Sequence, residues 1–167
     1  MNPSVVAQLE QLYADTDAAI AAAKPKCDAS GRCCRFREYG HTLFISRIEA
    51  DYLLAHAPAW SGPVSADFCP FQVEGLCTAR GPRPLGCRVY FCDPAWQERG
   101  EALTEAGIRT LKAMADEHGL AWEYAPLVRF LREAEERGGA ERGGADDVEG
   151  IGGGDRISLE VLPILPA

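Results

Sequence analysis

Apolar residues recur at helical spacing from the start of the chain, which predicts an amphipathic first helix. The residues that set this spacing are Val5, Leu9, Leu12 and Ile20. Asn2 followed by Pro3 is the pattern of a helix N-cap with proline in the first turn. Pro25 disfavours helical backbone at the residue before it, so we expect this helix to end near Ala23.

A short strand and a second helix are predicted next. Residues His41 to Ile45 are rich in β-favouring side chains, which is typical of a strand. Ser46 and Glu49 have the spacing of a capping box, in which the two side chains satisfy backbone N–H groups at the start of a helix. We therefore expect a helix from Arg47 to about His56, stopped by Pro58.

Two further helical segments are predicted in the second half of the chain. Asp93-Pro94 repeats the pattern of cap and proline, and one or two helices follow it as far as a glycine C-cap at Gly119. Another helix is expected from Pro126 to Arg137, ended by Gly138-Gly139. These elements predict a mainly α fold with a small irregular core, in which short helices flank cysteine-rich loops, with at most a short strand or two.

The stretch from Ala57 to Cys92 contains five prolines and four glycines and is expected to have little regular structure. It needs another source of order, which metal–thiolate bonds would supply. We interpret residues 1–137 as a single cysteine-cluster domain with its core at 27–92. Residues 138–155 read as a flexible linker of glycine and acidic residues, and 156–167 as a C-terminal tail.

Charge and composition exclude some classes of function. The formal net charge of −8 argues against general nucleic-acid binding, although residues 24–92 carry nine Lys or Arg against six Asp or Glu. Apolar runs are too short to span a bilayer, and no membrane partner is expected. The N-terminal residues do not read as a signal peptide, so we expect a cytoplasmic protein whose thiols stay reduced.

Seven cysteines gather in one stretch and are the main candidates for chemistry. They are Cys27, Cys33, Cys34, Cys69, Cys77, Cys87 and Cys92. In a reducing compartment this density favours metal ligation over disulfides, and the odd number agrees. The adjacent pair is hard to place on one ion, because successive side chains usually diverge; it serves two metals, or one member is a packing or redox thiol.

Two arginines next to cysteines are candidates for supporting roles. Arg35 follows Cys34 and Arg88 follows Cys87. We expect their N–H groups to donate to thiolate sulfur and so to orient and tune a bound metal.

The cysteine segment resembles the YkgJ-like CxxCxxCC cysteine-cluster family, described as a zinc- or iron-chelating domain. The resemblance covers about two fifths of the chain and begins with the run from Cys27 to the Cys33-Cys34 doublet. Its later motifs are Cys69-Pro70-Phe71, Gly75-Leu76-Cys77, Arg83-Pro84 and Cys87-Arg88-Val89-Tyr90-Phe91-Cys92. One departure is Ser30, where the family has a cysteine. Either a metal lacks a protein ligand there, or Asp28, His41 or water takes the place.

The resemblance implies an iron–sulfur protein, and some members carry the label oxidoreductase. The leading hypothesis is therefore a metal-binding protein that holds an iron–sulfur cluster through its cysteines, with a redox or electron-transfer role and an unidentified redox or protein partner. The alternatives are a zinc-stabilised binding module without catalysis and a metal-delivery or sensing protein. The residues leave open whether the chain is an enzyme and which side chain would be catalytic.

Overall fold

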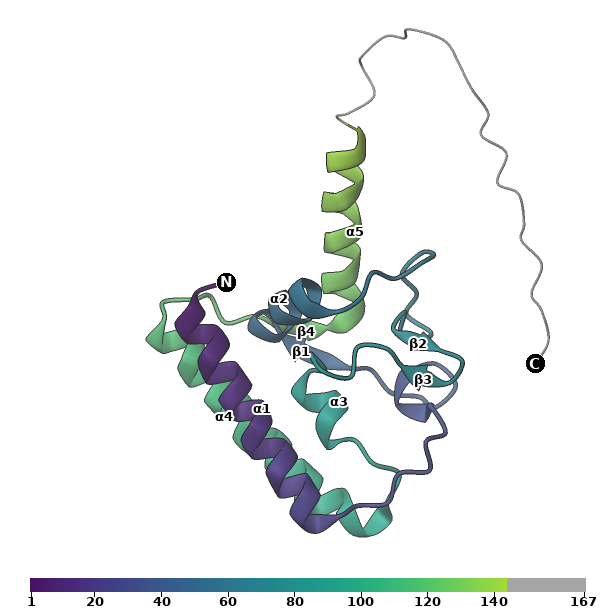
Figure 1. The fold of residues 1–167 in the computed structure, drawn as a ribbon, viewed down its shortest axis with the longest axis vertical. Coiled ribbons are helices and arrows are strands. Elements are labelled where there is room, and N and C mark those ends of the chain that lie inside the picture. Colours follow the sequence, from purple (N-terminus) through teal and green to yellow (C-terminus); the bar gives the residue numbers. More distant parts are fainter. Residues whose placement is uncertain (144–167) are drawn as a thin grey trace, which may run out of the picture.

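The computed structural model describes residues 1–143, with side chains as far as residue 138 (Figure 1). The helices are α1 (Pro3–Ala23), η1 (Arg32–Cys34), α2 (Arg47–His56), α3 (Leu85–Val89), η2 (Pro94–Trp96), α4 (Gln97–Glu117) and α5 (Leu127–Gly143). The strands are β1 (Phe44–Ser46), β2 (Gln72–Val73), β3 (Leu76–Cys77) and β4 (Tyr124–Pro126). The predicted mainly α fold with a few short strands is confirmed.

The two long helices α1 and α4 lie side by side in opposite directions, as Figure 1 shows. The Asn2 side chain accepts a hydrogen bond from the Ser4 N–H at 2.9 Å, so the predicted N-cap of α1 is confirmed. Leu9 of α1 and Leu111 of α4 are both fully buried in one hydrophobic cluster. Removing such apolar surface from water is what stabilises the pair.

The predicted capping box of α2 is confirmed. The Ser46 side chain accepts from the Glu49 N–H, and the Glu49 carboxylate accepts from the Ser46 N–H. The preceding strand starts at Phe44, three residues later than predicted, because it is defined by pairing with β4. Phe44 lies opposite Pro126 in that antiparallel pair, so Pro126 belongs to a strand and α5 begins one residue later.

The middle of the chain contains more regular structure than the sequence predicted. Strands β2 and β3 form a hairpin with Gln72 opposite Cys77. Its two-residue turn is Glu74-Gly75, with φ angles of 50° and 81°. Two left-handed residues are what the tightest hairpin turns require, and glycine adopts that conformation without strain. The hairpin therefore fixes the position of Cys77.

A second hydrophobic cluster lies between the cysteine loops and α5. Cys34 and Cys69 are buried there together with Leu53 of α2 and Phe130 of α5. The cysteine segment is thus packed on the helical body by apolar contacts as well as through any metal it binds.

Helix α5 projects away from the rest of the molecule in Figure 1 and runs to Gly143. The prediction that Gly138-Gly139 ends this helix is wrong, because α5 continues to Gly143. Intrahelical hydrogen bonds offset the conformational cost of these glycines. The remainder of the predicted linker and the tail at 156–167 lie outside the described residues. Among the described helices, none is long and apolar enough to cross a membrane.

Candidate metal centre

The adjacent cysteines point their sulfur atoms to the same place. Gly31 adopts a left-handed φ of 71° and turns the chain into the 3₁₀ helix η1, which carries Cys33 and Cys34. Their Sγ atoms lie 3.9 Å apart. The expectation that neighbouring side chains diverge is wrong here, because the turn at Gly31 and the tight helix bring both thiols to one side.

Two further thiols converge on Cys34 from distant parts of the sequence. The Cys69 N–H donates to the Cys34 carbonyl at 2.7 Å, which fixes the two loops side by side. Cys69 and Cys77 line the same small cavity as Cys33 and Cys34. Gln72 holds the hairpin that carries Cys77 in place, because its Nε2 donates to the Gly31 carbonyl at 2.9 Å.

The separation of the first two sulfurs matches that of thiolates on a shared ion. Zinc–sulfur bonds are about 2.3 Å long, and tetrahedral geometry then places two sulfurs about 3.8 Å apart. Cys33 and Cys34 are already at 3.9 Å. Within the described residues, however, no group of three or more His, Cys, Asp or Glu side chains is arranged to hold an ion as it stands. Some thiols must therefore turn before they close around a metal.

Cys87 completes the wall of a small, partly enclosed cavity of about 40 Å³. The cavity is lined by the five cysteines Cys33, Cys34, Cys69, Cys77 and Cys87, by Arg83 and by apolar residues of the second cluster. A space of this size takes a single ion or one or two waters.

The other two cysteines line an open groove of about 350 Å³ beside the enclosed cavity. Cys27 is exposed and Cys92 half-buried. The Lys26 N–H donates to the Asp93 carboxylate at 3.0 Å, which keeps these two segments together. The groove shares Cys33, Cys34, Cys77 and Cys87 with the enclosed cavity, so all seven predicted ligands line two adjoining spaces.

The convergence of thiols changes their pKa values in opposite directions. The hydrogen bond from the Cys34 thiol lowers the pKa of Cys33 to about 6 and that of Cys77 to about 6. The same contact lowers the pKa of Cys69. The pKa of Cys34 itself is raised, chiefly by its interaction with Cys33 and to a smaller extent by those with Cys69 and Cys77. Burial raises the pKa of Cys87.

The two predicted supporting arginines do not donate to sulfur. Arg35 donates to the Ser30 carbonyl and to Glu38. Arg88 is buried and donates to the carbonyls of Arg83 and Gly81 and to Asp17. Both prefer backbone carbonyls and carboxylates, which are stronger acceptors than sulfur. They stabilise the loops that carry the cysteines.

The arginine that faces the thiols is Arg83, which the sequence offered only as part of the motif Arg83-Pro84. It lines the enclosed cavity, and its positive charge lowers the pKa of Cys33 and of Cys77. Its Nε donates to the Arg80 carbonyl at 3.2 Å. Its position four residues before Cys87 was a weak signal, because the turn at Pro84 decides the direction of the side chain.

The position of the missing cysteine and the residues proposed to replace it as ligand lie in two different places. Ser30 and Asp28 line the open groove beside Cys27. His41 lies behind Cys33, with Nε2 3.4 Å from the Cys33 carbonyl oxygen and its ring stacked on Tyr90. Its buried Nδ1 has no hydrogen-bond partner within the described part of the chain. His41 thus contacts the backbone of Cys33.

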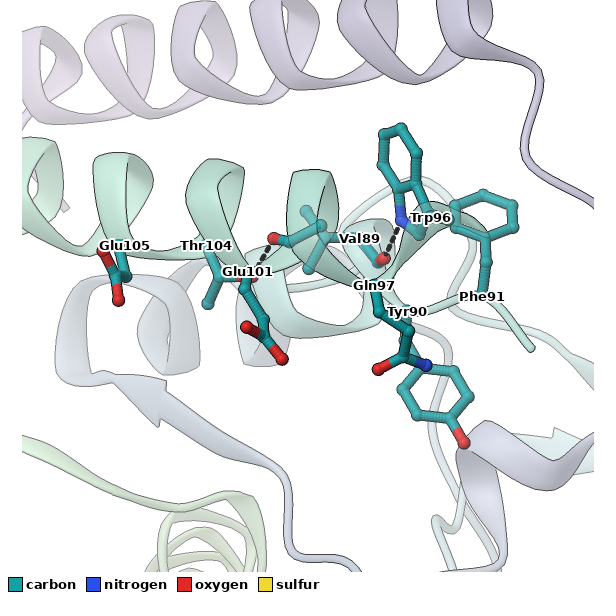
Figure 2. A pocket seen from close by; sticks show the side chains of 9 residues that line it. Val89, Tyr90, Phe91, Trp96, Gln97, Glu101, Thr104 and Glu105 are labelled. Carbon is teal, nitrogen blue, oxygen red and sulfur yellow. Dashed lines mark hydrogen bonds between the residues drawn. The ribbon is translucent and has the colours of Figure 1, made fainter. Parts of the chain in front are cut away.

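A second hollow, shown in Figure 2, lies between α3 and the start of α4. Trp96 closes one side of it, with Nε1 donating to the Val89 carbonyl at 2.8 Å. Glu101 and Glu105 line the other side, and Tyr90 and Phe91 separate this hollow from the thiol groove, to which they also belong. It contains no thiol, so the ligand chemistry of the chain lies on the cysteine side.

No family model, curated protein or solved structure matches this chain. The resemblance to the cysteine-cluster family therefore stays a prediction, and the function is argued from the site.

Proposed function

We propose that this chain is a metal-binding cysteine-cluster protein whose thiolates hold an iron–sulfur cluster, with a redox role. The observation that carries the proposal is that five cysteines line one small cavity, with the sulfurs of Cys33 and Cys34 3.9 Å apart: Cys33, Cys34, Cys69, Cys77 and Cys87. Four thiolates are the usual ligand set of iron–sulfur clusters and of structural zinc.

The donor set fits the proposed group. Thiolates suit iron–sulfur clusters and zinc, and Arg83 supplies positive charge beside them. When bound, an iron–sulfur cluster would accept and release an electron. The chain would hold the thiolates in place with the 3₁₀ helix and the hairpin, and would exclude water from one side with Leu53, Phe71 and Leu127.

Zinc is the second candidate, and two observations favour it. The enclosed cavity has the size of one ion, and the 3.9 Å separation of Cys33 and Cys34 suits two thiolates on one metal. The same separation also suits two ligands on one iron of a two-iron cluster.

Anaerobic purification separates the two. We expect a brown protein with visible absorption and with iron and acid-labile sulfide in each chain. The colour separates the two candidates because zinc, with its filled d shell, is colourless. Cys69→Ser should lose the colour, and the exposed Ser61→Ala serves as a matched control that keeps it. A colourless protein with stoichiometric zinc would show that the thiolates hold zinc and not an iron–sulfur cluster. A protein that takes up neither metal when both are supplied contradicts the proposal.

A further inference from the structure

The arginines that line the open groove differ from most others in the chain. Six arginines of the described residues form ion pairs with carboxylates: Arg35, Arg37, Arg47, Arg88, Arg109 and Arg129. The groove is lined by three others, Arg32, Arg80 and Arg83, and within residues 1–138 none of these is in such a pair. Asp28 is the one carboxylate among the residues that line the groove. Among its arginines and carboxylates the groove thus carries three positive charges against one negative, in a chain of net charge −8, while the thiolates of Cys33 and Cys77 add negative charge.

These three arginines face different surroundings. Arg83 is half-buried against the thiols, where it balances thiolate charge. Arg32 and Arg80 are exposed at the rim. The Arg32 guanidinium lies 5.3 Å from the centre of the Tyr39 ring, which restrains the side chain without neutralising it. Two cations at the mouth of the groove are therefore left to solvent.

One wall of the groove is aromatic. Tyr90 and Phe91 line it, and the Tyr90 ring is stacked on His41, which limits its movement. The volume of about 350 Å³ lies within the range of small-molecule sites. Apolar walls with a few polar groups placed at one end are the usual composition of such sites.

We propose that this groove binds a small organic anion, whose carboxylate or phosphate is held by Arg32 and Arg80 and whose apolar body lies against Tyr90 and Phe91. The statement that this ligand lies beside a metal rests on the proposed function, because the groove shares four cysteines with the enclosed cavity. Arginine suits this role because its planar fork donates two parallel hydrogen bonds to a carboxylate or phosphate.

A rival explanation is that Arg32 and Arg80 only offset the negative charge of metal thiolates. In that case removing them weakens metal retention and affects no ligand. The two explanations predict that the same double variant fails in different measurements, metal retention or anion binding, so measuring both separates them.

The test uses the full chain, purified anaerobically with its metal, and titrates phenyl phosphate, benzoate, inorganic phosphate and neutral phenol by calorimetry. We expect at least one of the two aromatic anions to bind, and to bind more tightly than phenol and inorganic phosphate. The double variant Arg32→Gln/Arg80→Gln should weaken that binding by about 10-fold or more, the scale of a lost hydrogen bond to a charged group. Arg132→Gln, an exposed arginine on α5, is the matched control and should change nothing.

Metal content and circular dichroism are measured on every variant. Binding lost from a folded double variant that keeps its metal supports the proposal. The proposal is overturned if neither aromatic anion binds, if phenol or inorganic phosphate binds as tightly, if the double variant binds normally, if Arg132→Gln weakens binding equally, or if the double variant loses its metal or its fold. A wild-type chain that takes up no metal refutes the proposed function, and the same titrations still decide whether the groove binds an anion.

Discussion

The sulfur atoms of Cys33 and Cys34 lie 3.9 Å apart on one turn of 3₁₀ helix, close to the separation of two thiolates on one tetrahedral metal. Adjacent cysteines are thereby able to act as a pair. Cys34 is the buried member of the pair and lines the same cavity as Cys69 and Cys77, so we take it as the centre of the arrangement.

Replacement of this central cysteine should cost more than replacement of one at the rim. We expect Cys34→Ser to lose at least one metal equivalent per chain, because a hydroxyl is a much poorer ligand than a thiolate. Cys27→Ser should lose less, since Cys27 is exposed and lines only the groove. Metal analysis after dialysis against a chelator measures both. Equal retention in the two variants would remove Cys34 from the ligand set.

The glycine before η1 gives a second prediction with a matched control. A Cβ at Gly31 would meet the Gln72 side-chain amide and, at 2.9 Å, the Gly75 carbonyl oxygen, both in the hairpin that carries Cys77. Gly40 has a similar left-handed φ of 64° but nothing within 4 Å. Both alanine variants carry the same backbone strain, of about 1 kcal/mol or more. Only Gly31→Ala should also displace the hairpin and weaken metal retention.

Competition with a graded series of chelators measures this difference. Equal metal retention in Gly31→Ala and Gly40→Ala would show that the position of the hairpin does not matter for the centre.

The two arginines beside cysteines should differ in their effect on stability. Arg88 is 6 % exposed, lies 4.0 Å from the Tyr13 ring centre and satisfies the Gly81 and Arg83 carbonyls. Arg88→Ala should lower the free energy of unfolding by about 2–4 kcal/mol, since a buried side chain loses its packing against Tyr13 and the part-buried acceptors lose their donor. Arg35→Ala removes a solvent-exposed pair and should cost about 1 kcal/mol or less. Urea denaturation checks this, and equal losses would contradict it.

Much of the fold follows from local patterns. The N-cap at Asn2, the capping box at Ser46 and the helix bounds near Ala23 and His56 are set by neighbouring residues, so the sequence predicts them. The strand at Tyr124–Pro126 was missed, because it forms only by pairing with β1, about 80 residues away in the sequence.

The candidate site shows the same division. The ligand-type residues are visible as a run of cysteines, and the structure brings them together. Proximity to Cys87 in the sequence predicts that the Arg88 donors reach sulfur, but it does not determine the direction of the side chain. The donors bond instead to Asp17, Gly81 and Arg83. The role of Arg83 also depends on tertiary packing.

Buried Glu49 predicts a pH dependence of stability. Its carboxylate accepts hydrogen bonds from Ser46, Leu85 and Tyr13, yet burial raises its pKa above the usual value. A raised folded-state pKa means that the folded protein binds the proton more tightly than the unfolded chain does. The contribution is present below the unfolded pKa and is lost as pH rises through the folded pKa.

The variant Glu49→Gln has no charge to bury and isolates this effect. Its stability relative to wild type should improve as the pH rises from about 4 towards 8, although the lost hydrogen bonds give it a constant deficit. Urea unfolding of both proteins across that range measures the difference. A difference that does not change with pH, or that favours wild type increasingly as pH rises, would contradict the raised pKa.

The central claim is that the converging thiols bind a metal, and X-ray absorption at the metal edge tests it most directly. On protein purified anaerobically we predict a nearest shell made of sulfur, at about 2.3 Å, with metal–metal scattering if the occupant is an iron–sulfur cluster and none if it is zinc. A nearest shell of oxygen or nitrogen alone, or a chain that retains no metal after growth with iron and zinc, would contradict the account.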